Sequence, residues 1–373
     1  MARRFVMASL MAAILTVSPW SRAITILSGP SFTPATNAPL AGLLQLTTDV
    51  DSRVSVLVSD GTDIWERDFY DYATTHSVPL LGFKPDRTNQ ILVTVYDEHR
   101  NAYTAPQLLT SVTAPLPTNF PSWTVLTSEP DAMEPGYTLF IIQSGPYCYI
   151  IVMDNSGEVV WYAPWTHNDS DVRQLDNGDL FIEQQNPSNK FLEINMLGDT
   201  VNTWDAPAGY PVNPHEGLVT EHGTIMYLSD ASQSVSNFPS NDTDSNAPLK
   251  TVNIDDNPVV EISFTNSALL HTWSPLNLLD PTRVTYLTYE YPSAYGVDNE
   301  HANAILEDTN DNSIIVSLRD QNAVFKFSRS TGQLKWILGP PANWGTNWQP
   351  YLFTPVGTPF DWNYGQHAPE LTP

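Results

Sequence analysis

The chain has 373 residues, enough for two domains with substantial hydrophobic cores. Its 41 acidic and 16 basic residues give a formal net charge of −25, which argues against binding to nucleic acid, and no nucleic-acid partner is expected. The 31 prolines and 11 tryptophans, with few long runs of helical periodicity, predict an all-β protein with many turns.

Residues 1–23 have the pattern of a signal peptide. Arg3 and Arg4 form a positive start, an apolar run covers Phe5–Val17, and Ser21-Arg22-Ala23 has the small-x-small form of a cleavage site. The apolar run is shorter than the about 18–20 residues of a membrane anchor. We therefore expect a periplasmic or secreted protein with no membrane anchor after cleavage, exported by the general or the twin-arginine route.

Residues 24–114 are predicted to form a small N-terminal β-sandwich domain. Strand-like segments occur at Leu43–Thr48, Arg53–Ser59 and Ile91–Tyr96. The proline-rich segment 115–121 is typical of a stiff linker, so we expect a second domain over residues 122–373.

The second domain contains a repeated unit in which a glycine turn leads into a strand and a tryptophan. It occurs at 153–161, 194–204 and 327–336, and a degenerate copy ends at Trp273. The spacing fits four-stranded blades with insertions, so we predict a β-propeller whose repeated tryptophans serve blade packing rather than ligand binding. The polar segment 229–258 is predicted to be a long surface insertion.

The block from His301 to Gly339 is the most regular part of the sequence. Strands are predicted at Ser313–Leu318, Ala323–Ser328 and Gln333–Leu338, with Gly, Asn, Asp and Ser in the turns between them. Folding of this meander does not require a histidine at its entrance or an arginine at the end of its first strand. His301 and Arg319 are therefore candidate site residues.

Three of the eight histidines share a position in the repeat. Each of these histidines stands just before the pattern of an inner strand of a blade: His215 in NPHEG, His301 in NEHAN and His367 in YGQHA. Equivalent positions on successive blades of a propeller converge on the central channel. Together with Arg319 they predict a cationic site rich in hydrogen-bond donors. The other five are expected to be solvated or hydrogen-bonded without a common function: His76, His99, His167, His222 and His271.

Such a group suits a sulfate or phosphate ester. Arginine offers a planar fork to a tetrahedral oxyanion, and imidazole can act as a nucleophile or a proton donor. A three-histidine metal site with Glu216 or Glu300 as a further ligand is the alternative. We predict no metal and no cofactor, and the sequence has no P-loop, dinucleotide fingerprint or G-x-S-x-G elbow.

The block HANAI…SIIVSLRDQNAVFKFSRSTGQLKWILG resembles the signature region of the bacterial arylsulfate sulfotransferases, which use no nucleotide sulfate donor. EPGYTLFII, DNSGEVVWY, NPHEGLVTEHGTIMYL and YGQHAPEL follow in the family's order. The resemblance implies a six-bladed propeller that moves a sulfuryl group from an aryl sulfate to a phenolic acceptor by a two-step, ping-pong route.

The same resemblance implies the roles of individual residues. His367 of the QH motif is the histidine that becomes sulfated, and His301 of the H-x-N motif and Arg319 neutralise charge on the sulfuryl oxygens. His215 is expected to be catalytic as well, as the protonated imidazole that helps the phenolate leave. Arg319 and Asn303 are the expected substrate-binding residues.

Two features depart from the family pattern. The single cysteine, Cys148, cannot form the disulfide found near the active site of periplasmic members, and we expect it to be a core residue. The chain ends at Pro373, soon after His367, where family members continue, so we expect a C-terminally truncated propeller. A homodimer is one oligomeric state that remains open.

Two other functions remain as alternatives. The first is a sulfatase-like or phosphatase-like hydrolase, in which water is the acceptor. The second is a secreted, non-catalytic propeller that binds a carbohydrate or a protein, for which the three histidines need not face one cavity.

Overall fold

The computed structural model describes residues 24–144, 146–165, 171–185, 188–244, 246–291, 293–357 and 360–372. The predicted signal peptide and His167 lie outside these residues. In the described part the regular structure is almost all strand, and its helices are one α-helical turn, α2 (Pro275–Leu278), and short 3-10 turns. The all-β prediction is thus confirmed. No helix in this part is long and apolar enough to cross a membrane.

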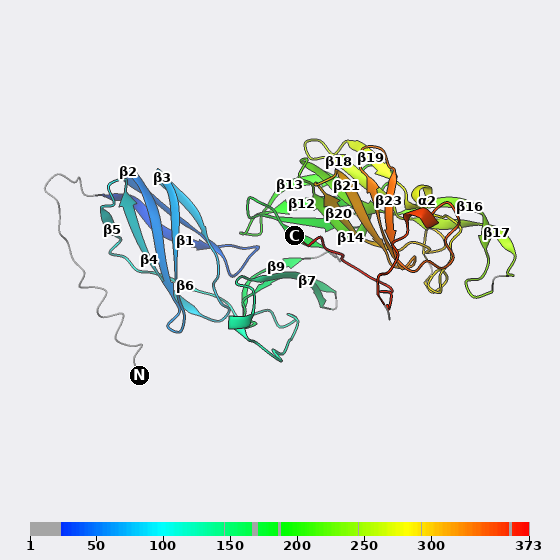
Figure 1. Ribbon diagram of the computed structural model, residues 1–373. Helices are drawn as coiled ribbons and strands as arrows, with labels where there is room; N and C mark the ends of the chain where they lie inside the picture. The colour runs from blue at the N-terminus through cyan, green and yellow to red at the C-terminus, as the bar shows by residue number, and fades with distance from the viewer. Residues whose placement is uncertain are drawn as a thin grey trace. The chain divides into compact units, whose positions relative to one another are not determined.

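The chain divides between Leu116 and Pro117 into two compact units. The first unit contains six strands (Figure 1): β1 (Ile26–Pro34), β2 (Gly42–Ser59), β3 (Ile64–Leu80), β4 (Thr88–Asp97), β5 (Ala102–Thr104) and β6 (Leu109–Val112). Val54, Val56 and Val58 alternate along β2 and are fully buried, as a strand with one face on the core requires.

One strand, β2, organises this first unit. It runs for 18 residues where the sequence predicted two shorter strands, because the polar residue Ser52 still pairs with Ala73 of β3 and Asp97 of β4. The first part of β2 pairs with β1 and its second part with β4, so all six strands form one hydrogen-bonded sheet. The N-terminal β domain is confirmed, with strands linked through β2 rather than split into two separate sheets.

The second unit consists of small antiparallel sheets whose strands mostly follow chain order. The first has three strands: β7 (Thr138–Ser144), β8 (Tyr147–Met153) and β9 (Val159–Trp165). The second contains β10 (Val172–Gln174), β11 (Leu180–Gln184), β12 (Lys190–Ile194) and β13 (Thr200–Asp205). The third contains β14 (Val212–Val219), β15 (Thr224–Ser229), β18 (Val259–Ser263) and β19 (Leu269–Trp273). The fourth contains β20 (Ala302–Asp308), β21 (Ser313–Leu318), β22 (Ala323–Ser328) and β23 (Leu334–Leu338).

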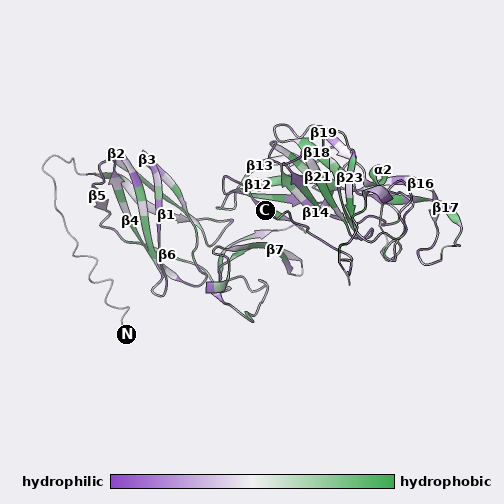
Figure 2. Ribbon diagram, viewed as in Figure 1, coloured by the Kyte–Doolittle hydropathy of each residue, from purple (hydrophilic) through white to green (hydrophobic). Residues whose placement is uncertain are grey.

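Neighbouring sheets pack face to face, which gives the unit its propeller-like architecture. Phe191 of the second sheet contacts Tyr227 of the third, with ring centroids 4.9 Å apart. Met226 of the third sheet shares a core with Val316 and Phe325 of the fourth. Because the middle strands are covered on both faces, all six residues of β21 are buried, and hydrophobic residues run along the strands in Figure 2.

The repeated glycine turns are the hairpins that lead into the outermost strand of each sheet. Gly157, Gly198 and Gly332 have φ values of 80°, 82° and 69°, a region that glycine enters without a steric penalty. In the degenerate copy Ser267 takes this position with φ of 57°. The repeat in the sequence therefore reflects a hairpin turn with one residue of positive φ, which appears four times and in two lengths: Gly157 and Gly198 bond back three residues, and Gly332 and Ser267 bond back four.

The repeated tryptophans connect one sheet to the next. Trp161 on β9 donates a hydrogen bond to the Met196 carbonyl oxygen at 2.8 Å, and Trp204 on β13 donates to that of Phe264 at 2.6 Å. Both acceptors lie in the hairpin turn of the following sheet. The predicted packing role of these side chains is thus confirmed.

Replacing Trp204 with phenylalanine should destabilise the second unit by about 1–3 kcal/mol, because the carbonyl oxygen of Phe264 would lose its indole donor. The aromatic contact with the Phe264 ring, now 4.6 Å away, would largely remain. Urea unfolding would measure the loss. Trp273→Phe is the matched control. The ring centroids of Trp273 and Phe327 are 5.8 Å apart, and the Trp273 indole makes no hydrogen bond to a described residue. An equal loss in both variants would contradict the hydrogen-bond explanation.

The predicted insertion at 229–258 is a β-hairpin and not an irregular loop. Strands β16 (Ala231–Pro239) and β17 (Leu249–Asp256) pair with each other and project from the third sheet (Figure 1). They lie between β15 and β18, which pair directly. Ile254 near the base of the hairpin and Phe238 near its far end bury their side chains in one cluster with Leu276 of α2, which holds the hairpin along its length.

Candidate functional site

The three histidines selected from the sequence lie close together. The ring centroids of His215 and His301 are 5.2 Å apart, and those of His215 and His367 are 6.5 Å apart. His301 immediately precedes β20, as predicted. His215 instead lies within β14, and no described strand follows His367.

Irregular pairing positions these residues. β14 and β20 are the first strands of neighbouring sheets and contact each other. The register of β14 shifts between Val212 and Gly217, around His215, and that of β20 shifts between Ala302 and Ala304. A bulge of this kind turns side chains away from the regular alternation of a strand.

The Nδ1 atom of each ring faces an oxygen. The partners are Asn213 Oδ1 for His215 at 2.8 Å, Asp298 Oδ2 for His301 at 2.7 Å, and the Gly365 carbonyl oxygen for His367 at 3.0 Å. An oxygen of a carbonyl or carboxylate group only accepts hydrogen bonds, so each Nδ1 carries the hydrogen. The Nε2 atom of each neutral ring therefore keeps its lone pair.

Two of the rings have opposite protonation tendencies. The hydrogen bond that His301 donates to Asp298 raises the pKa of His301, against the effect of burial. Burial lowers the pKa of His215 to about 4, and the neighbouring His301 and His367 rings act in the same direction. At neutral pH His215 is the neutral ring, and His301 is the one stabilised as a cation.

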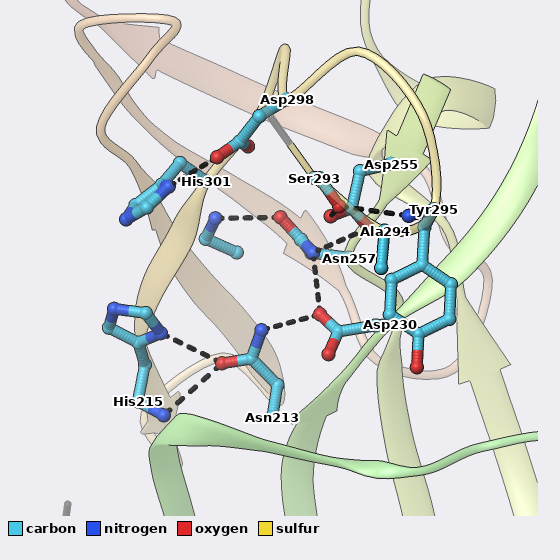
Figure 3. Close-up of a pocket in the computed structure, with 11 residues that line it drawn as sticks. Asn213, His215, Asp230, Asp255, Asn257, Ser293, Ala294, Tyr295, Asp298 and His301 are labelled. Carbon is cyan, nitrogen blue, oxygen red and sulfur yellow. Dashed lines mark hydrogen bonds and ion pairs between the residues drawn. The ribbon is translucent and has the colours of Figure 1, made fainter. Parts of the chain in front are cut away.

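A cavity of about 220 Å³ lies beside His215 and His301 (Figure 3). Its walls carry three carboxyl groups, from Asp230, Asp255 and Asp298. Burial raises the pKa of Asp255 to about 7, so this carboxyl group is partly protonated near neutral pH. The cavity is therefore not the cationic site expected from the histidines and the arginine alone.

His367 is exposed and, like Arg319 and Asn303, does not line this cavity. The Arg319 guanidinium donates to Asp320 Oδ1 at 2.6 Å and lies 4.8 Å from the centre of the Tyr291 ring. Its charge lowers the pKa of His301, so the two groups are electrostatic neighbours. Asn303 donates to the Gln366 carbonyl oxygen at 2.9 Å.

The segment that carries His367 is held by its neighbour Gln366. Gln366 Nε2 donates to the carbonyl oxygens of Leu318 and Ala323, each at 3.0 Å. The amide nitrogen of Gly365 donates to Asn322 Oδ1 at 2.9 Å. The QH motif thus pairs a side chain that anchors the segment with a side chain that faces the site.

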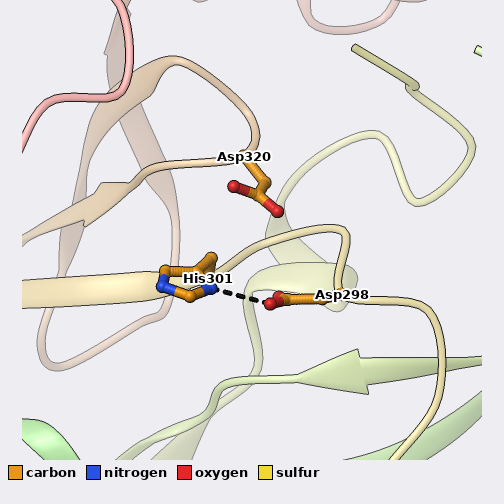
Figure 4. A group of neighbouring side chains, drawn as sticks. All are labelled: Asp298, His301 and Asp320. Atoms are coloured by element: carbon orange, nitrogen blue, oxygen red, sulfur yellow. Dashed lines mark hydrogen bonds and ion pairs between the residues drawn. The ribbon is translucent and has the colours of Figure 1, made fainter. Parts of the chain in front are cut away.

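Asp298, His301 and Asp320 could hold a divalent cation, since one ligand atom from each lies within 4.8 Å of the others (Figure 4). The positive partner of Asp320 in this structure is Arg319. Glu216 and Glu300, the further ligands considered from the sequence, have other partners. Glu216 forms an ion pair with Arg173, and the buried Glu300 accepts a hydrogen bond from the backbone N–H of Asn257 at 2.9 Å.

The remaining described histidines have local surroundings, as predicted. His76 is buried and lies 3.3 Å from Ser52 Oγ, and His222 lies 3.5 Å from Glu307. His99 and His271 are exposed. Cys148 is buried in β8, in agreement with its predicted core role.

Sequence reasoning missed the polar residues around the histidines: Asn213, Asp230, Asp255, Asn257 and Asp298. Two of them could have been found from their place in the sequence, because Asn213 precedes His215 by two residues and Asp298 precedes His301 by three. The other three lie at the base of a hairpin whose polar composition resembles that of a surface loop.

Comparison with known proteins gives a family for both units. The family described as Arylsulfotransferase (ASST) matches residues 124–373, and the one described as Arylsulfotransferase Ig-like domain matches residues 31–113. The arylsulfate sulfotransferases AssT of Escherichia coli O6:H1 and Lelliottia amnigena are 25% and 24% identical over 280 and 282 residues, which is 60% of this chain and 44% of each relative. The chain thus spans less than half the length of the curated relatives it matches.

The likeness to solved structures is weaker. A protein of unknown function from Bacteroides caccae is 10% identical, with 79% of this chain and 96% of that chain covered, at a TM-score of 0.34. A TM-score this low supports no assignment. The assignment follows from the family match, which covers about two thirds of the sequence and includes all the candidate site residues. The chain belongs to the arylsulfotransferase family.

Proposed function

We propose that this protein transfers a sulfuryl group from an aryl sulfate to a phenolic acceptor through a sulfated histidine, His367. Family membership supports aryl sulfotransferase activity in general. The observation that supports the finer proposal is the grouping of His215, His301 and His367, each with its Nδ1 atom turned to an oxygen. A non-catalytic propeller would not require this grouping.

In the first step, His367 attacks the sulfur atom of the donor. Its Nδ1–H is held by the Gly365 carbonyl oxygen, so the lone pair on Nε2 is the nucleophile. A nitrogen–sulfur bond forms while the sulfur–oxygen bond to the aryl group breaks, and the electron pair leaves on the aryl oxygen. In the second step a phenol takes the sulfuryl group and the electron pair returns to Nε2.

His301 and Arg319 have the charge that this reaction needs. Asp298 favours the imidazolium form of His301, and Arg319 stays positive at any relevant pH. Both can donate hydrogen bonds to the sulfuryl oxygens, and His301 can give a proton to the departing aryl oxide. His215, expected from the sequence to be that proton donor, does not suit this role, since its pKa of about 4 keeps it neutral.

The N-terminal sequence pattern supports export to the periplasm or secretion as the location of this activity. The substrates would be small molecules, as membership of the sulfotransferase family supports.

The proposal predicts that product formation depends on an added phenol. With an aryl sulfate alone, we expect release of aryl alcohol to stop after about one equivalent per chain, as a sulfated enzyme accumulates. With a phenol present, turnover should continue and yield the sulfated phenol. Sustained release of free sulfate without a phenol would identify a hydrolase instead. A chelator should not change the rate, and a loss restored by a divalent metal would support the metal site.

A further inference from the structure

The orientation of the Asn213 side chain is fixed by two contacts other than the imidazole. Its Oδ1 accepts the backbone N–H of His215 at 3.2 Å, and its Nδ2 donates to Asp230 Oδ1 at 2.6 Å. A flipped amide would place two donors together and two acceptors together. Oδ1 is therefore the atom that faces His215 Nδ1, and the imidazole must donate.

Asp230 is the centre of a longer chain of hydrogen bonds (Figure 3). Its Oδ1 also accepts from Asn257 Nδ2 at 3.1 Å, and Asn257 Oδ1 accepts the backbone N–H of Ala302 at 2.9 Å. The chain thus runs from His215 on β14, across the two ends of the inserted hairpin, to the first residue of β20. In each of these hydrogen bonds only one partner can be the donor, so the network fixes which atom of Asn213 faces His215.

We propose that Asn213 and Asp230 are positioning residues that hold His215 in the tautomer with a free Nε2, so that His215 accepts the proton of the incoming phenol. The inference rests on the proposed function and assigns the second step of that reaction. As the phenol oxygen bonds to sulfur, the nitrogen–sulfur bond to His367 breaks and the phenolic proton passes to His215 Nε2.

The geometry allows this transfer. The rings of His215 and His367 are 6.5 Å apart between centroids. A phenol between them can donate its O–H to a His215 nitrogen at an ordinary hydrogen-bond length of about 2.7–3.2 Å while its oxygen faces the sulfur atom carried by His367 Nε2. His215 is in ring contact with His367, and its centroid also lies 5.2 Å from that of His301. The proton that His215 accepts can therefore pass to His301 and restore the imidazolium ion that protonated the first aryl oxide, which closes the cycle.

The charges around His215 agree with a neutral ring that gains basicity during the reaction. Facing groups come from three elements: His301 and Asp298 before β20, His367 on the C-terminal segment, and Asp230 and Asp255 at the hairpin base. In the free protein burial and the two neighbouring rings keep His215 neutral. Sulfation leaves the net charge of His367 unchanged while Nδ1 keeps its hydrogen, because the positive ring offsets the sulfuryl oxygens. Those oxygens carry the negative charge on the side of an approaching phenol, where they would favour a protonated His215.

The tautomer can be tested without turnover, by long-range ¹H–¹⁵N NMR of the histidine rings in the full chain. His215 should show a protonated Nδ1 and an unprotonated Nε2 at neutral pH. Asn213→Asp should convert it to the imidazolium form, because a carboxylate at this position favours the charged ring. If the neutral His215 ring in the unchanged protein carried its hydrogen on Nε2 instead of Nδ1, the proposal would be overturned.

The two half-reactions give the functional test in single-turnover experiments. Asn213→Asp should form sulfo-His367 but transfer it to a phenol about 10²-fold more slowly near neutral pH, with the transfer rate recovering at higher pH. Asp230→Ala should slow transfer in the same direction, since the Asn213 amide would then lose the contact that fixes its orientation. Asn266→Asp adds the same charge on an exposed turn and should change neither step.

The outcomes separate the inference from the proposed function. Equal slowing of both half-reactions in Asn213→Asp, with an unchanged pH profile, would overturn the role of His215. No sulfation of His367 in the unchanged protein would overturn the proposed function and with it this step.

Discussion

His367→Asn is expected to abolish both the sulfated intermediate and the transfer to phenol, with a loss of at least about 10³-fold in rate. Asparagine can keep a polar contact near the Gly365 carbonyl oxygen, but its amide nitrogen has no available lone pair for attack on sulfur. The segment itself should stay in place, because Gln366 and Gly365 make the anchoring contacts. Mass spectrometry after alkaline handling, which preserves the nitrogen–sulfur bond, would measure the adduct.

Arg319→Lys is the informative companion to this variant. Lysine keeps the charge but loses the planar fork, so we expect adduct formation and transfer to slow by about 10²–10³-fold while the adduct still maps to His367. An adduct on another residue, or undiminished transfer in His367→Asn, would refute the nucleophile.

The largest loss of stability is expected from Arg329→Met. The Arg329 guanidinium donates to Glu261 of the third sheet and to Glu307 of the fourth, and its Nη2 is 3.1 Å from Thr224 Oγ1. The three charged side chains are between 3% and 9% exposed. Removing the guanidinium would leave two buried carboxylates without the cation that they share, which typically costs about 3–5 kcal/mol.

Urea unfolding of the full chain, followed through the transition of the second unit, would measure this loss. Lys335→Met is the matched control, because Lys335 and Asp311 are 31% and 44% exposed and such pairs contribute about 0–1 kcal/mol. Arg329→Lys should lie between the two, as it keeps the charge but cannot bridge both carboxylates with a planar group. A similar small loss in all three variants would show that the bridge between the sheets contributes little.

The local sequence pattern was sufficient to predict the bounds of some strands but not of others. The observed bounds of β21 and β22 match the prediction, because apolar runs there end at clear polar turns. The length of β2 was missed because Asp49, Asp51 and Ser52 have turn-like composition. The strand nevertheless continues across a register shift after Thr47, and Ser52 pairs on both sides, with Ala73 and Asp97.

The residues of the candidate site also fall into two groups, those that the local sequence indicates and those that it does not. His215, His301 and His367 could be selected because they stand in recognisable local motifs. Asp230 could not, since nothing near it in the sequence differs from a surface turn. Its importance comes from Asn213 and Asn257, which converge on it only in the folded chain. Residues of this kind are set by tertiary contacts, which a local pattern does not contain.

The inserted hairpin is structurally separable from the sheet that carries it. Since β15 and β18 pair directly, the sheet is complete without β16 and β17. Asp230 and Asn257 flank the hairpin where it leaves and re-enters the sheet, while the described residues of the turn between Pro239 and Leu249 are mostly polar and exposed. Relatives could therefore lengthen, shorten or recompose the far end during evolution and keep the wall of the cavity, provided that the two junctions are retained.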